Sequence, residues 1–185
     1  MAPQPIRECD PQADAEPGEG AGAMSALRFR VAVLMHDRVV FRVAAALLRD
    51  AREAEDVTQE VFLSYWQHGD TVKRPREWLL QVTRNACLSR LRKAGRLVTK
   101  EPEELPEQAD GRDPAWEYEQ HELAGALRKL VDTLPEPQRS LLVMFDVQGL
   151  DGATCGRVLG LSTTQVKVYL HRARRRLRRQ LERES

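Results

Sequence analysis

Hydrophobic residues recur at helical spacing through much of the chain, and they nowhere alternate with polar residues long enough to predict a strand. In the N-terminal half this pattern predicts three helices. The first ends at residues 49–50, the second ends at 69–70, and the third begins at Pro75 and stops near Gly95. Their apolar positions are Leu34, Val40, Ala44 and Leu47 in the first helix, Ala54, Val57, Val61 and Tyr65 in the second, and Leu79, Leu80, Val82, Cys87 and Leu91 in the third.

Helical patterning returns in the C-terminal half, from Trp116 onward. A helix is predicted at about 138–147, and a short helix at 153–159 runs into a turn at Gly160. A last helix begins at Ser162, where Gln165 three positions later completes a capping box. Its buried row is predicted to be Val166, Leu170, Ala173 and Leu177. Two helices joined by a short glycine turn indicate a helix-turn-helix, whose second helix enters a major groove.

The fold class that follows is all-α, with two small helical domains joined by a flexible acidic linker. Seven of the ten prolines lie in the N-terminal tail and in the linker, which leaves the two blocks free to be helical. The tail is too polar and too rich in proline and glycine to bury a core, so we expect it to be disordered. The predicted divisions are a tail at 1–26, a three-helix block at 27–96, a linker at 97–115 and a helix-turn-helix block at 116–185.

Net charge follows the same divisions, although the total is only +1. Residues 1–26 carry −4, residues 27–96 carry +6, residues 97–126 carry −7 and residues 127–185 carry +6. Charge asymmetry between parts of a chain indicates contact with nucleic acid or with a membrane surface. The near-neutral total is therefore a cancellation between two basic blocks and two acidic segments.

Composition argues against several other classes. The longest apolar run, Val43–Leu48, is far too short to span a membrane, and the acidic N-terminus does not resemble a secretory signal, so we expect a cytoplasmic protein without membrane insertion. The three cysteines, Cys9, Cys87 and Cys155, form neither a disulfide framework nor a zinc pattern. No phosphate loop, nucleophile motif or carboxylate pair is present. We therefore expect no catalytic residue, no metal, no cofactor and no enzymatic activity.

The last helix carries the strongest functional signal. Between Gly152 and Leu181 there are eight basic residues and no acidic residue. An arginine run is often only a solvated helix face, but here it coincides with the capping box and the glycine turn. Short polar side chains at the start of the helix can reach base edges, and the arginines further on can reach phosphates. The candidate DNA-contacting residues are Ser162, Thr163, Thr164, Gln165, Lys167, His171, Arg172, Arg174 and Arg175.

Two groups of motifs resemble one known family. Residues 134–139 (LPEPQR), 159–162 (LGLS) and 166–174 (VKVYLHRAR) resemble the fourth conserved region of extracytoplasmic-function (ECF) sigma factors, which belong to the sigma-70 family. Residues 54–62 (AEDVTQEVF), together with Trp78-Leu79 and Arg84-Asn85, resemble the second region of that family. The two regions occur in the family's order, with an acidic linker between them.

The resemblance implies a role for each block. The second region would bind the clamp coiled coil of the largest subunit of core RNA polymerase, and it would also recognise and melt the −10 promoter element. The fourth region would read the −35 element and contact the polymerase flap, and an anti-sigma factor is a usual partner. Core binding is implied for Asp56, Gln59, Glu60, Phe62 and Leu63. The −10 and melting contacts are implied for Lys73, Arg74, Arg76, Trp78, Arg84, Asn85 and Arg92, although periodicity alone favours Trp78 as a core residue.

Some residues depart from the family pattern. Gly152 and Gly156 lie in the first helix of the helix-turn-helix, where each costs about 1 kcal/mol relative to alanine, so we expect a loosened motif. Val168 and Tyr169 replace the usual polar pair after Lys167, which predicts an altered −35 sequence.

The alternative function is a stand-alone helix-turn-helix transcriptional regulator, with the first block as an oligomerisation or sensor module. A metal-dependent enzyme built on scattered histidines and aspartates is the least favoured reading. The leading hypothesis is a sigma factor that directs promoter-specific initiation in a stress or signal response.

Overall fold

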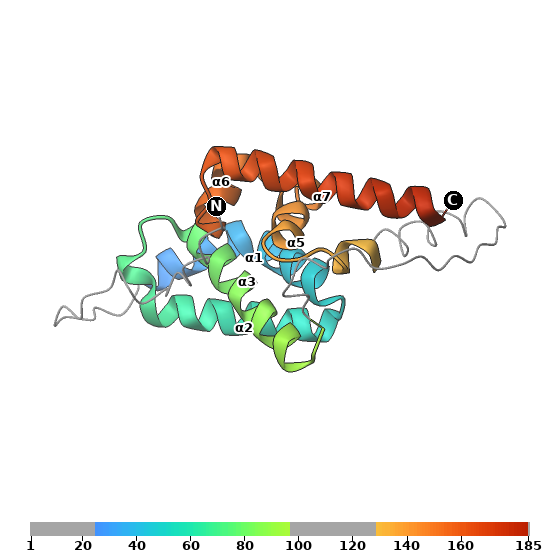
Figure 1. Ribbon diagram of the computed structural model, residues 1–185. Helices are drawn as coiled ribbons and strands as arrows, with labels where there is room; N and C mark the ends of the chain where they lie inside the picture. The colour runs from blue at the N-terminus through green and yellow to red at the C-terminus, as the bar shows by residue number, and fades with distance from the viewer. Residues whose placement is uncertain (1–24, 97–128, 185) are drawn as a thin grey trace, which may run out of the picture.

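The computed structural model describes residues 25–96 and 129–184, and within these ranges every regular element is helical (Figure 1). The predicted all-α class is confirmed. The predicted N-terminal tail and acidic linker fall largely outside the described residues, as does the start of the helical patterning at Trp116.

The first block is a bundle of the three predicted helices: α1 (Ala26–Leu48), α2 (Ala51–His68) and α3 (Pro75–Lys93). The single turn η1 (Gly69–Thr71) follows α2. Asp50 separates the first two helices because its carboxylate accepts hydrogen bonds from the backbone N–H groups of Arg52 (2.8 Å) and Glu53 (3.0 Å), which caps α2. These hydrogen bonds lower the pKa of Asp50, with the bond from Glu53 the larger cause.

One predicted core position in α1 is wrong. Leu34 is 85% exposed, whereas Val40 and Ala44 are fully buried. Leu34 lies six residues before Val40, which turns it about 120° away from the buried row at the helical angle of about 100° per residue. Ala32 occupies the buried side of this part of α1 instead.

The second block contains helical residues 129–132, α5 (Gln138–Leu142), a π-helical turn η2 (Val143–Val147), α6 (Gly152–Leu159) and α7 (Thr163–Glu184). The predicted helix at 138–147 is therefore present, although its second half is π-helical. The predicted row Val166, Leu170, Ala173 and Leu177 is buried, and so are Leu130, Val131 and Leu134.

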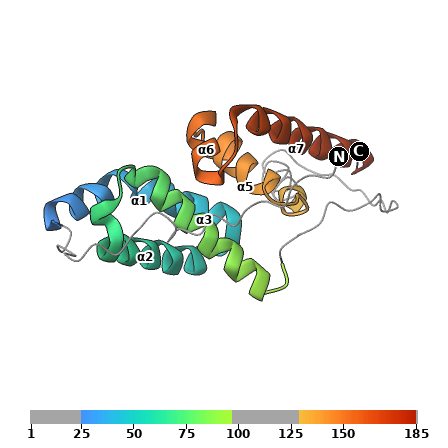
Figure 2. The ribbon, with the colours of Figure 1, turned by 60° about the vertical axis from the view of Figure 1, so that its left-hand side comes forward.

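The two blocks pack directly against each other, and their buried residues form one continuous core (Figures 1 and 2). α3 contacts α6, and α1 contacts η2. The linking groups include Arg139 of α5, whose guanidinium donates a hydrogen bond to the carbonyl oxygen of Leu47 in α1. This contact holds the second block, with the exposed basic residues of α7, against the first block.

Candidate polymerase and nucleic-acid interfaces

The outward face of α2 carries a mixed acidic and apolar patch. The core of this helix is formed by Ala54, Val57 and Val61, and the residues on the opposite side are Asp56, Gln59, Glu60 and Leu63. Leu63 is 59% exposed, although it is a large apolar side chain. Arg90 of α3 pairs with Glu60 at 2.5 Å and approaches Asp56 at 4.0 Å, which offsets part of the negative charge. The structure therefore brings four of the five predicted core-binding residues onto one face.

Phe62 is the exception among the predicted core-binding residues. It is 7% exposed, and its ring makes an edge-to-face contact with Phe29 of α1 at 6.4 Å between centroids. Phe62 therefore stabilises the bundle beneath the patch instead of presenting its ring to a partner. The hydrophobic pattern did not single out Trp66, which is 38% exposed and packs edge-on against the same Phe29 at 5.0 Å.

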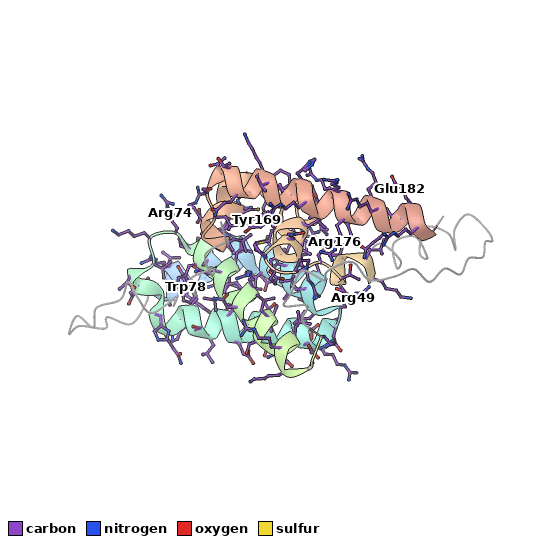
Figure 3. The ribbon with its side chains drawn as sticks, viewed as in Figure 1. Arg49, Arg74, Trp78, Tyr169, Arg176 and Glu182 are labelled. Atoms are coloured by element: carbon purple, nitrogen blue, oxygen red, sulfur yellow. The ribbon has the colours of Figure 1, made fainter. Side chains whose placement is uncertain are left out.

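The end of the connection between α2 and α3 and the first turn of α3 carry an exposed basic cluster, Lys73, Arg74 and Arg76. Arg74 and Trp78 are labelled in Figure 3. The ring of Trp78 packs on buried Tyr65, with 5.6 Å between centroids, so Trp78 is a partly buried anchor of the bundle, as its periodicity favoured. Exposed Arg92 lies near the other end of α3, about 24 Å along the helix from Arg76 at 1.5 Å per residue. It does not share a local site with the basic cluster.

Arg84 is engaged by the second block. Its Nε donates a hydrogen bond to Ser140 Oγ at 3.1 Å, and its Nη2 pairs with Glu136 at 3.2 Å. Its Nη1 also donates to the side-chain oxygen of half-buried Asn85 at 3.4 Å. Because these contacts hold its guanidinium, Arg84 is not available for the predicted DNA contact in this arrangement. Nothing in the sequence pattern indicated that the two blocks pack together here. Arg157 of α6 and Glu77 of α3 form a second ion pair between the blocks, at 2.9 Å.

The helix-turn-helix has the predicted local geometry. Gly160 adopts the left-handed conformation, with φ of 64°, and ends α6. The backbone N–H of Ser162 donates to Gln165 Oε1 at 2.8 Å, and the backbone N–H of Gln165 donates to Ser162 Oγ at 3.2 Å. The capping box is therefore formed. Ser162 and Gln165, which were predicted to contact DNA, thus both use their side chains in this box.

Gly156 of α6 lies directly against the turn of the helix-turn-helix. A Cβ atom on this residue would lie 2.8 Å from the carbonyl oxygen of Leu161, closer than real Cβ contacts occur. The backbone N–H of Leu161 also donates to the carbonyl of Gly156 at 2.8 Å. The predicted loosening by glycine does not account for this position, because the tight turn leaves no room for a side chain. At Gly152, in contrast, a Cβ would make ordinary contacts.

The side of α7 opposite its buried row is exposed. It presents Thr164, Lys167, Val168, His171, Arg172 and Arg175, with Thr163 at the start of the helix. Tyr169 and Arg176, labelled in Figure 3, are half-buried instead. The exposed side is thus basic and polar, with one apolar residue, Val168, within its first two turns.

Arg174 differs from the other arginines of α7. Its guanidinium makes two hydrogen bonds to the carboxylate of Asp146 in η2, at 3.0 Å and 2.5 Å, and lies 5.7 Å from the centre of the Phe145 ring. The bond to Asp146 raises the pKa of Arg174. Arg174 was predicted to contact phosphate. In this structure its charge is already paired with Asp146, although both Arg174 and Arg175 are exposed.

The described residues contain no group of three or more histidine, cysteine or acidic side chains placed to hold a metal ion. Burial raises the pKa of the Cys87 thiol to about 12 and that of Cys155 to about 11. Such thiols are inert at neutral pH and act as small apolar core residues. Across the part of the chain that the structure describes, no helix has the length and apolar character that a membrane span requires.

These features define a two-block helical protein with a basic helix-turn-helix and a separate acidic and apolar face on α2. Comparison with known proteins specifies the class further. Residues 32–97 match the family model for sigma-70 region 2, and residues 124–177 match the model for sigma-70 region 4. The chain belongs to the sigma-70 family and is an ECF-type sigma factor, which binds core RNA polymerase and directs promoter-specific initiation of transcription.

Curated relatives of the chain are also ECF sigma factors. The chain is 33% identical over 170 residues to the ECF sigma factor SigL of Mycobacterium tuberculosis, with 88% of this chain and 94% of SigL covered. It is 32% identical to SigE of Mycolicibacterium smegmatis, of which it spans 61%, with 83% of this chain covered. The stand-alone regulator is therefore not favoured.

Solved structures share the fold. CnrH, solved in complex with the cytosolic domain of CnrY, aligns with a TM-score of 0.64 and 22% identity over 89% of this chain and 94% of CnrH. RpoE of Bartonella quintana, solved with the anti-sigma factor NepR, aligns with a TM-score of 0.59 and 21% identity over 84% of this chain and 97% of RpoE.

Proposed function

We propose that this sigma factor divides its work among three surfaces. The outward face of α2, with Asp56, Gln59, Glu60 and Leu63, binds the clamp coiled coil of the largest polymerase subunit. The basic cluster at the start of α3, with Lys73, Arg74 and Arg76, contacts the −10 element. The exposed side of α7 reads the −35 element, and the rest of the second block contacts the flap.

The observation that best supports this division is the separation of charge and apolar surface on the described helices. The α2 face combines two carboxylates with the exposed side chain of Leu63, which suits a protein partner better than DNA. The exposed side of α7 has cationic and hydroxyl groups and no carboxylate between Gly152 and Leu181, which suits a phosphate backbone and base edges.

Arg84 joins the −10 surface only when the contact between the two blocks opens. While Arg84 bonds Glu136 and Ser140, its guanidinium is held against the second block. The −10 and −35 elements are separate sites on the promoter, so the two blocks must part to reach them. We expect Arg84 and Asn85 to become available at that stage.

The protein acts as a non-catalytic subunit, in the cytoplasm beside the polymerase. An anti-sigma factor is its expected regulator, since CnrH and RpoE were each solved with a bound partner and NepR is an anti-sigma factor. CnrH and RpoE share the fold of this chain. Capture of a protein by the tagged chain, together with inhibition of transcription by that protein, would support an anti-sigma factor.

Run-off transcription tests the central proposal. Purified chain is added to core RNA polymerase with fragments of genomic DNA, and transcripts are mapped. We expect discrete start sites that depend on both components. Tight binding of the chain alone to duplex DNA as a dimer, with no promoter-dependent transcript, would instead support a stand-alone regulator.

A further inference from the structure

Val168 is an apolar side chain at the centre of the exposed side of α7. It lies two residues from both Val166 and Leu170, which are 3% and 6% exposed, so it is turned about 160° away from each of them. Val168 itself is 41% exposed. Its side chain therefore points away from the core of the second block.

Val168 belongs to a straight stripe along the helix. Thr164, Val168, His171 and Arg175 follow one another at spacings of four, three and four residues, which places them on one face, and all four are exposed. Lys167 and Arg172 flank the stripe on either side. A helix that enters the major groove with this stripe inward has phosphate-binding cations around Val168 and brings its side chain to the base edges.

The chemistry of the groove then restricts what Val168 can recognise. Valine has no hydrogen-bond donor or acceptor, so it cannot read the polar atoms of guanine, cytosine or adenine. Among the four standard bases, thymine is the one that presents a methyl group, at C5, on its major-groove edge. A valine that faced a polar edge would instead remove water from that edge without replacing its hydrogen bonds.

We propose that Val168 is a specificity-determining residue that selects a thymine in the −35 element through its C5-methyl group. This inference rests on the proposed −35 role of α7 and deepens it. It assigns the departure of Val168 from the usual polar residue to a change in the preferred base. Burial of one methyl group contributes about 0.8 kcal/mol, which corresponds to a preference of about fourfold.

The test uses the full chain bound to core polymerase. Promoter duplexes with a randomised −35 region are selected by this holoenzyme and sequenced, and each thymine of the preferred element is then replaced by deoxyuridine, which lacks only the methyl group. We expect one position at which deoxyuridine weakens binding about fourfold. In the Val168→Ala variant this loss should fall to less than twofold at the same position.

Val31→Ala is the matched control, because Val31 is also an exposed valine, at 50%, but lies in α1 of the first block, outside the three proposed surfaces. It should leave the deoxyuridine effect unchanged. Deoxyuridine substitutions that have no effect at any position, or an effect that persists in Val168→Ala, would overturn the inference while leaving the −35 role of α7 intact. A holoenzyme that selects no −35 sequence at all would overturn the proposed role, and this inference with it.

Discussion

The guanidinium of Arg139 in the second block donates a hydrogen bond of 2.6 Å to the carbonyl oxygen of Leu47 in the first block. Leu47 lies in the last turn of α1, where carbonyl groups lack an intrahelical partner. Arg139 is only 2% exposed and also pairs with Asp132 at 2.9 Å. A buried charge in one block therefore satisfies an open helix end in the other, which makes the stability of each block depend on the other.

We expect Arg139→Ala to destabilise the chain by about 3 kcal/mol. The substitution leaves the Leu47 carbonyl without its donor, opens a cavity between the blocks and removes one of the two arginine partners of Asp132. Chemical denaturation followed by circular dichroism measures the change. Arg178→Ala, at an exposed position of α7, should stay within about 0.5 kcal/mol of the parent chain. Equal stability of the two variants would contradict the assigned contact.

The two glycines of α6 should respond in opposite directions to alanine. In Gly156→Ala the new Cβ would meet the Leu161 carbonyl oxygen, whose backbone cannot move without opening the turn. We expect a loss of about 1–3 kcal/mol, as in other overpacked sites, in spite of the better helix propensity of alanine. Thermal unfolding of the full chain measures the loss.

Gly152→Ala is the matched control in the same helix. Its Cβ would lie 3.6 Å from Phe145 and 3.7 Å from Val166, at ordinary van der Waals distances, so we expect no loss and a gain of up to about 1 kcal/mol. If Gly156→Ala proved as stable as Gly152→Ala, the glycines would matter only through helix propensity, and the close approach at Leu161 would have no consequence.

Local patterns predicted the helices and the turn because their causes lie within a few residues in the chain. The row Val166, Leu170 and Ala173 follows from helical periodicity, and the box between Ser162 and Gln165 spans three positions. The docking role proposed for the outward face of α2, in contrast, came only from the family resemblance.

Contacts between distant segments were beyond the reach of these patterns. Arg84 was predicted to contact DNA, but it binds Glu136 and Ser140, which lie 52 and 56 positions further along the chain. Arg174 looked the same as Arg175 until Asp146, 28 residues earlier, was found beside it. Gly156 was predicted to loosen its helix. The pattern did not show that a carbonyl of the turn between the helices, that of Leu161, excludes a side chain at this position. In each case the unexpected feature is the partner of a residue and not the helix in which it lies.

Asp56→Arg should weaken binding to core polymerase by at least tenfold. It reverses a charge on the outward face of α2, where the side chain of Asp56 is 67% exposed, and it places a second cation near Arg90. Because the helix core is untouched, the fold should be retained. Co-purification with core polymerase at equal concentrations measures the loss.

Glu55→Arg provides the matched control for this charge reversal. Glu55 is exposed and precedes Asp56 in sequence, but it lies about 100° around the axis of α2 from Asp56, at the edge of the patch. We expect it to retain most of the core binding. Equal loss in both variants would point to net charge, and unchanged binding in Asp56→Arg would remove the docking assignment.

Arg175→Ala should weaken promoter binding nearly equally across −35 sequences and reduce its salt dependence. A phosphate contact releases about one counterion, so the slope of log K against log salt should become shallower by about 0.9. Arg174→Ala should change the slope by less than half as much, because the guanidinium of Arg174 is already paired with Asp146. Holoenzyme binding to one promoter duplex, measured over a series of salt concentrations, gives both slopes. A loss in Arg175→Ala confined to one base position would identify a base contact in place of a phosphate contact, and equal slopes for the two variants would show that the Asp146 pair opens on DNA.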